Sequence, residues 1–116
     1  MSDIGHSGMW TGDMVDLSRP GQGYIRAAGS LGWGLPAALG AQVAQPDRPV
    51  VLFTGDGGLW YHVGELETAA RCGIPAVIVV NNNSSLNQHR SHPALGSQCT
   101  VPRAEVLPAC QRLCKY

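Results

Sequence analysis

The sequence has no run of charge of one sign. Its eight basic and eight acidic side chains cancel, so the 116-residue chain carries a formal net charge of +0. Surfaces that attract nucleic acid or an anionic membrane depend on clustered like charge. We therefore expect neither nucleic acid nor a membrane among the partners of this chain.

A segment long enough to span a membrane is also missing. The longest apolar stretches, residues 50–53 and 74–80, are far shorter than the ~20 residues that a spanning helix needs. No charged and then apolar signal segment opens the chain. Together these absences predict a cytoplasmic location.

The motifs of several other kinds of site are absent as well. Cys110 and Cys114 are four positions apart, and neither a CxxC pair nor a following histidine pair gives the spacing of a zinc site. The phosphate-binding pattern G-x-x-x-x-G-K-[ST] does not occur, and the stretch from Gly55 to Trp60 misses the final glycine of a dinucleotide fingerprint. Structural zinc and these two nucleotide-binding motifs are therefore disfavoured.

What the sequence does contain is the pattern of one βαβ unit. The continuous apolar run from Pro49 to Thr54, bounded by proline and glycine, is typical of a strand buried on both faces. An amphipathic pattern predicts a helix over residues 59–72, with Gly73 at its C-terminal cap. A second buried strand is expected over residues 76–80. The prediction is an α/β fold built on a parallel sheet with a right-handed crossover.

The remaining segments give weaker patterns. Residues 1–23 are rich in glycine and predict a loop, residues 24–28 a short strand, and residues 35–44 a helix. The apolar face expected for that helix consists of Leu35, Ala38, Leu39 and Gln42.

The end of the chain interrupts the alternation of strand and helix. We expect a domain over residues 1–90, incomplete as a fold, and an irregular tail over residues 91–116 with a helix hinted at residues 104–115. A truncated and a frameshifted ending both stay open.

Two polar clusters follow the two predicted strands. Gly55-Asp56-Gly57-Gly58 comes after the first strand, and residues 81–85, Asn-Asn-Asn-Ser-Ser, come after the second. In an open parallel sheet, ligands bind beyond the carboxyl ends of the strands, so Asp56 and Asn83 can face one site. Carboxylate, amide and carbonyl oxygens suit Mg²⁺ or Ca²⁺, and a diphosphate held by the amides of Gly57 and Gly58 would complete the coordination of Mg²⁺. Either cluster alone would be read as a polar turn.

The order G-D-G, then about 25 residues, then N-N resembles the signature of thiamine diphosphate (ThDP) enzymes. Residues 28–38, AGSLGWGLPAA, look like the preceding segment of acetolactate synthase-like and benzaldehyde lyase-like members. The resemblance covers about residues 3–90 and implies the ThDP-binding fold in partial form.

The resemblance also implies roles for particular residues. Asp56, the Asn83 side chain and the Ser85 backbone carbonyl would bind Mg²⁺, and the choice between Asn82 and Asn83 stays open. Leu31 falls where the family places a bulky aliphatic residue under the cofactor. The stretch containing His6 and Ser7 resembles the loop that contacts the diphosphate.

The function implied is that of a ThDP- and Mg²⁺-binding domain in a lyase or transferase, an acetolactate synthase-like carboligase acting on a 2-oxo acid or aldehyde. The family's catalytic glutamate lies on a separate pyrimidine-binding domain, usually from a neighbouring subunit, so such a partner and a homo-oligomer are expected. No catalytic residue is assigned in this chain, because Glu65 and Glu67 fall within the predicted helix. The alternative is a fragment that binds cofactor and turns nothing over.

Overall fold

A computed structural model of the chain describes residues 1–84 and residue 86. The predicted tail over residues 91–116 and the helix hinted at residues 104–115 lie outside the described residues. Within the described part the elements are α1 (His6–Met14), α2 (Gly34–Ala44), β1 (Val51–Gly55), α3 (Asp56–Tyr61), α4 (Glu65–Arg71) and β2 (Val77–Asn81). None of these helices is long and apolar enough to cross a bilayer.

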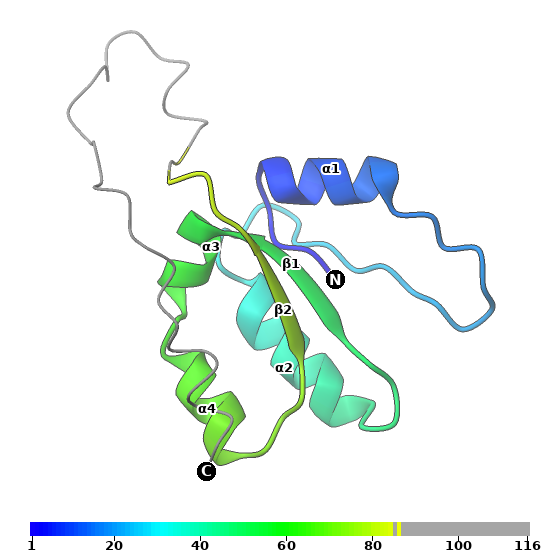
Figure 1. Ribbon diagram of the computed structural model, residues 1–116, viewed down its shortest axis with the longest axis vertical. Coiled ribbons are helices and arrows are strands. Elements are labelled where there is room, and N and C mark those ends of the chain that lie inside the picture. Colours follow the sequence, from blue (N-terminus) through cyan, green and yellow to red (C-terminus); the bar gives the residue numbers. More distant parts are fainter. Residues whose placement is uncertain (85, 87–116) are drawn as a thin grey trace, which may run out of the picture.

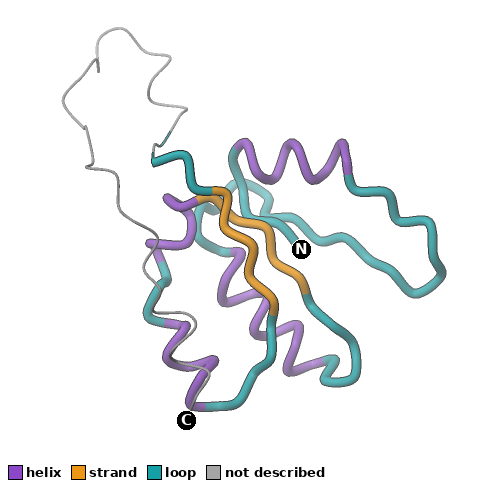
Figure 2. Tube along the Cα trace, viewed as in Figure 1, coloured by secondary structure: helices purple, strands orange, loops and turns teal. Residues whose placement is uncertain are grey.

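The two strands pair in parallel, as the sequence pattern predicts. Their register runs from Val51 opposite Val77 to Gly55 opposite Asn81. Figure 1 draws both strands as arrows that run in the same direction, and Figure 2 shows the helical segments and loops that make the crossover between them. The α/β class with a parallel βαβ unit is therefore confirmed.

The core lies between α2 and the sheet. Leu35, Ala38 and Leu39 of α2 form a buried cluster with Leu52 of β1. Each fully buried leucine of this kind contributes roughly 1.5–3 kcal/mol relative to an exposed one. The predicted face of α2 is confirmed, because Gln42 is buried beside these residues and its amide binds the backbone at both ends of the turn into β1. Partly buried residues of α4 and β2 pack against this cluster: Leu66, Ala69 and Ile78.

The prediction that both strands are buried on two faces is wrong for the described part of the chain. The face that carries Leu52 and Ile78 packs against α2 and α4. Side chains of the opposite face remain exposed: Val51 by 38%, Val77 by 51% and Val79 by 39%. A parallel sheet is buried on two faces only where helices cover both, and the described crossover covers one.

The helix predicted over residues 59–72 is two helices. It begins earlier than expected, at Asp56, and α3 ends at Tyr61 before α4 begins at Glu65. The backbone between them makes short-range bonds, from His62 N to Leu59 O at 3.3 Å and from Glu65 N to His62 O at 2.9 Å. Such bonds three residues apart tighten the chain and redirect it.

The first 28 residues also depart from prediction. The expected loop over residues 1–23 contains helix α1, which lies apart from α2 and α4 beside the N-terminal segment (Figure 1). Its buried positions are the small residues Ser7, Gly8 and Thr11, so the helix has no large apolar stripe to reveal it. In place of a strand over residues 24–28, Arg26 alone forms a bridge to Ser2, which in turn bridges to Phe53 of β1.

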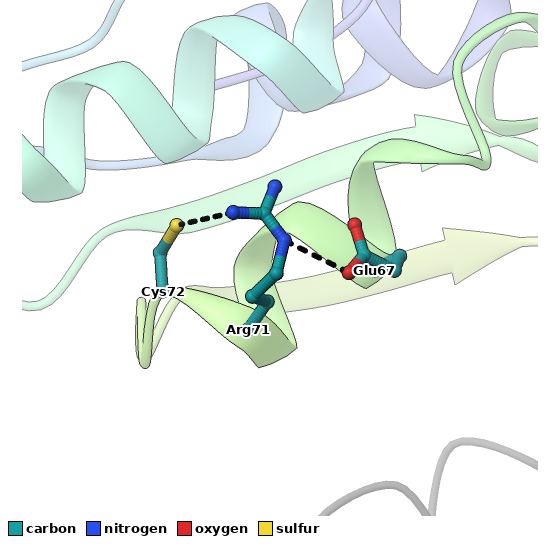
Figure 3. Close-up of polar contacts among 3 residues, drawn as sticks. All are labelled: Glu67, Arg71 and Cys72. Carbon is teal, nitrogen blue, oxygen red and sulfur yellow. Dashed lines mark hydrogen bonds and ion pairs between the residues drawn. The ribbon is translucent and has the colours of Figure 1, made fainter.

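The outer surface of α4 carries an ion pair. Arg71 donates from Nε to Glu67 Oε1 at 2.9 Å, one helical turn away, and from Nη1 toward the sulfur of Cys72 at 3.8 Å (Figure 3). The hydrogen bond to Glu67, with its negative charge, raises the pKa of the Arg71 guanidinium above its ordinary value. Exposed ion pairs contribute little to stability, and this pair lies on the face of α4 that points to solvent.

Candidate functional site

The carboxyl ends of the two strands meet at one edge of the sheet. Gly55 and Asn81, the last residues of β1 and β2, are partners in the register. Helix α3 starts directly after β1, and the asparagine cluster follows β2 beside it (Figure 1). The residues after the strands are therefore brought together, as the parallel topology requires.

A cavity of about 190 Å³ lies at this edge, and we refer to it as the strand-end cavity. Its wall includes Gly55 and Asn81 from the strand ends. It also includes every described residue that the sequence pointed to as cofactor-binding: Asp56, Gly57, Gly58, Leu31, Asn83, His6 and Ser7. These come from four separate stretches of sequence, which the fold gathers around one space. Ser85 lies outside the described residues.

The geometry distinguishes Asn83 from Asn82. Asn83 lines the strand-end cavity, whereas Asn82 does not. The side-chain oxygen of Asn82 instead accepts from the backbone N–H of Ser84 at 2.9 Å, which makes a local turn. Ser84 adopts a positive φ of 54° in that turn. Asn82 thus shapes the loop, and Asn83 is the asparagine of this loop that faces the cavity.

Two helices begin at the strand-end cavity. Gly5, His6 and Ser7 at the start of α1 line one side, and the first turn of α3 lines another. Gly5 enters α1 with a φ of 96°, a conformation that favours glycine. His6 is stacked on Trp10 one turn later, with ring centroids 5.8 Å apart. Free N–H groups at helix starts favour an anion, so this wall suits phosphate oxygens.

Glycine is required at Gly58, because its neighbours leave no room for a side chain. A Cβ atom there would lie 2.3 Å from Asp3 Oδ2 and 2.9 Å from Thr54 Oγ1. The backbone of α3 can therefore approach the N-terminal segment closely, and the peptide groups of its first turn come to the cavity wall.

Sequence reasoning missed Asp3, which lies behind the cavity wall. This side chain is fully buried and accepts hydrogen bonds from Ile4 N at 2.8 Å, Gly32 N at 2.9 Å and Thr54 Oγ1 at 3.3 Å. The donors lie up to 51 positions away in the chain. Ile4 and Leu86 also line the cavity, and the sequence does not predict them. Each is a single apolar residue in a loop, so neither belongs to a repeating apolar pattern.

The donor set of the strand-end cavity fits a hard cation that keeps several non-protein ligands. Asp56 offers a carboxylate, and Asn81 and Asn83 offer amide oxygens. Among the described residues, no group of three or more His, Cys, Asp or Glu side chains could hold a metal ion. A site of one carboxylate with amide and carbonyl oxygens is what Mg²⁺ uses when phosphate oxygens complete its octahedron.

Comparison with known families bears on the same residues. The family described as thiamine pyrophosphate enzyme, C-terminal TPP binding domain, matches residues 3–107 of the chain. The chain belongs to this family. The matched range includes every wall residue of the strand-end cavity, from Ile4 to Leu86.

Three named relatives are also similar to this chain. Acetolactate synthase isozyme 1 large subunit of Escherichia coli (strain K12) is 41% identical over 86 residues, which are 73% of this chain and 15% of that protein. Benzoylformate decarboxylase of Pseudomonas aeruginosa is 45% identical over 71 residues, 61% of this chain and 13% of that protein. Alpha-keto-acid decarboxylase of Mycobacterium avium (strain 104) is 54% identical over 63 residues, 54% of this chain and 11% of that protein.

These relatives are much longer than this chain. The match spans only 11–15% of the relatives' own length. Most of each relative therefore has no counterpart in this chain.

Proposed function

We propose that this chain binds thiamine diphosphate together with Mg²⁺ at the strand-end cavity, as the TPP-binding domain of an enzyme that acts on a 2-oxo acid. The observation that supports this most strongly is the lining of one cavity by residues from α1, the Leu31 turn, α3 and the Asn83 loop. Membership of the TPP-binding family supports the same ligand.

Each group in the cavity has a proposed part in binding. Asp56 and Asn83 supply oxygens to Mg²⁺, with the backbone carbonyl of Ser85 as a further ligand. The amides of Gly57 and Gly58, together with His6 and Ser7, hold the diphosphate. Leu31 supports the cofactor rings. When bound, the cofactor supplies the electron sink needed to break or form a carbon-carbon bond next to a carbonyl group.

The class of substrate follows from the relatives. Two of them are named as decarboxylases, one of benzoylformate and one of alpha-keto acids. A third is an acetolactate synthase. We propose a 2-oxo acid or aldehyde as substrate, with carboligation of the acetolactate synthase type as the favoured reaction.

The size of the strand-end cavity supports a need for a partner. About 190 Å³ is smaller than the roughly 300–1,000 Å³ of typical small-molecule sites, so the described residues would enclose only part of the cofactor. A pyrimidine-binding domain or subunit, in a homo-oligomer or otherwise, would enclose the rest and supply the catalytic glutamate. Glu65 and Glu67, which lie on α4, do not line the cavity. The partial enclosure of the cofactor also favours the second candidate, which is a chain that binds the cofactor but turns nothing over on its own.

Calorimetric titration of the purified chain with ThDP, with and without Mg²⁺, tests the proposal. We expect binding that requires Mg²⁺. Loss of outer-shell partners alone weakens metal sites about 10–100-fold, so Asp56→Ala and Asn83→Ala, which remove direct ligands, should weaken binding by about a hundredfold or more.

Asp47→Ala is the matched control, because Asp47 is exposed in the turn between α2 and β1 and does not line the cavity. It should bind like the unaltered chain. Binding that is indifferent to Mg²⁺, or equal losses in Asp47→Ala and Asp56→Ala, would contradict the proposed site. Turnover of a 2-oxo acid by the chain alone would exclude the candidate without turnover.

A further inference from the structure

We propose that the buried carboxylate of Asp3 is a positioning residue for the cofactor site. In this proposal Asp3 holds the backbone amide of Gly32 and thereby fixes the preceding residue, Leu31, in the cavity wall. The inference rests on the proposed function, because Leu31 is the residue expected to support the cofactor rings.

The hydrogen bonds of Asp3 are concentrated on Gly32. Both carboxylate oxygens accept from Gly32 N, Oδ1 at 3.2 Å and Oδ2 at 2.9 Å. The same side chain accepts from Ile4 N at 2.8 Å and from the Thr54 hydroxyl at 3.3 Å. All of these partners are donors, which suits a carboxylate that can only accept. A buried charge is costly unless it is satisfied in this way, so the donors and the carboxylate hold one another in place.

Gly32 is also held from its other side. Its carbonyl oxygen lies 3.0 Å from Nδ1 of His62, which must carry the proton because a carbonyl only accepts. Gly32 has a φ of 88°, and a Cβ atom there would lie 2.5 Å from Tyr61 Cβ. Asp3 therefore fixes the N–H of this residue while the end of α3 fixes its carbonyl, and the turn has little freedom left.

The contacts of Asp3 join three parts of the strand-end cavity. Ile4 and Leu31 line it, and Thr54 precedes Gly55 and Asp56 in the chain. The bonds to Gly32 act on the Leu31 side, where the rings are expected. The diphosphate is expected at the starts of α1 and α3, which do not include Gly32. Losing the Gly32 bonds should therefore affect the whole cofactor more than it affects diphosphate.

Asp3→Asn tests this with little change of shape. In either orientation of the new amide, its nitrogen would face Gly32 N, at about 2.9 Å in the place of Oδ2 or about 3.2 Å in the place of Oδ1, and two donors repel. We expect amide hydrogen exchange of residues 29–33 to rise about tenfold, with exchange of β1 unchanged. Affinity for ThDP with Mg²⁺ should fall about tenfold, whereas affinity for inorganic diphosphate with Mg²⁺ should change less than about twofold.

Two further variants are compared with Asp3→Asn. Asp16→Asn alters an exposed aspartate and should leave exchange and both affinities unchanged. His62→Ala removes the partner of the Gly32 carbonyl from an exposed position, so it should act in the same direction as Asp3→Asn with a smaller effect.

If Asp3→Asn fails to fold, hydrogen exchange of the Gly32 amide, measured by NMR in the unaltered chain, tests the proposal instead. Strong protection of that amide, with a selective loss of ThDP affinity in His62→Ala, supports the proposal. An unprotected Gly32 amide overturns it. In the folded variant, faster exchange in β1 as well as in the turn, or equal losses for ThDP and diphosphate, would show a general structural role and overturn it too.

The proposed function can fail separately. If the unaltered chain binds neither ThDP nor diphosphate, the cofactor proposal fails for this chain. The exchange measurements still decide whether Asp3 positions the turn, because they need no ligand.

Discussion

At the scale of single residues, Gly58 shows how closely the cavity wall is packed. A Cβ atom at this position would approach Asp3 Oδ2 to 2.3 Å, and Asp3 cannot move aside without losing its hydrogen bonds. Overpacking of this kind costs about 1–3 kcal/mol. We expect Gly58→Ala to lower the free energy of unfolding by about that amount in urea denaturation followed by circular dichroism.

Gly40 provides the matched substitution. It is an exposed position of α2, and a Cβ atom there would have nothing within 4 Å. Alanine is the better helix former, so Gly40→Ala should raise the free energy of unfolding by about 0.5–1 kcal/mol. Equal effects of the two substitutions would mean that the close contact behind Gly58 does not exist.

The sequence could predict the residues in front of the cavity better than those behind it. Asp56 and Asn83 follow apolar strands, and a parallel crossover brings such positions to one edge whatever the rest of the fold does. Asp3 could not be predicted in this way. Its partners Gly32 and Thr54 are 29 and 51 positions away, and no periodic pattern relates a buried carboxylate to backbone donors at such separations.

At the scale of elements, the end of α4 is set by its cap. Ile74 N donates to Ala69 O at 2.9 Å and Gly73 N to Ala70 O at 3.3 Å, which are the two bonds of a Schellman motif. Gly73 has a φ of 63°, where a side chain is strained, although a Cβ atom would meet nothing within 4 Å. Gly73→Ala should therefore lower the free energy of unfolding by about 1–2 kcal/mol, measured in urea.

The start of α4 supplies the opposite case. Gly64 is also in open space, but its φ of −58° and ψ of −24° are helical. Gly64→Ala should raise the free energy of unfolding by about 0.4–1 kcal/mol, because alanine restricts the unfolded chain and adopts this conformation without strain. The pair isolates backbone conformation from packing, so effects of the same sign would contradict the φ assigned to Gly73.

The helix that the sequence predicts correctly repeats large apolar residues on one face, and the helix that it does not predict lacks such a repeat. The helix from Gly34 to Ala44 was foreseen because Leu35, Ala38 and Leu39 recur on one face. Helix α1 was missed because it buries Ser7, Gly8 and Thr11. The break between α3 and α4 was missed because its residues, 62–64, keep the apolar spacing across the turn, and only the backbone bonds reveal the change of direction.

At the scale of the whole molecule, the sheet of the described chain has one covered and one open face. The covered face carries Leu52 against α2, while Val77 and Val79 on the open face are 51% and 39% exposed. Parallel sheets in proteins are generally covered on both faces, so the apolar strand sequence predicts the composition of this face but not its exposure.

The open face should make the isolated chain self-associate. Among the described residues β2 pairs only with β1. Exposed apolar patches on a sheet, next to such a strand edge, promote contact between chains. The double substitution Val77→Thr and Val79→Thr keeps the β-branched shape that favours a strand while adding hydroxyl groups. We expect it to lower the weight-average mass in sedimentation equilibrium toward that of one chain. Val43→Thr, at a 62% exposed position of α2 outside the sheet, should leave the association unchanged. If Val43→Thr lowers the mass as much as the double substitution does, general surface hydrophobicity drives association and the sheet face has no special part in it.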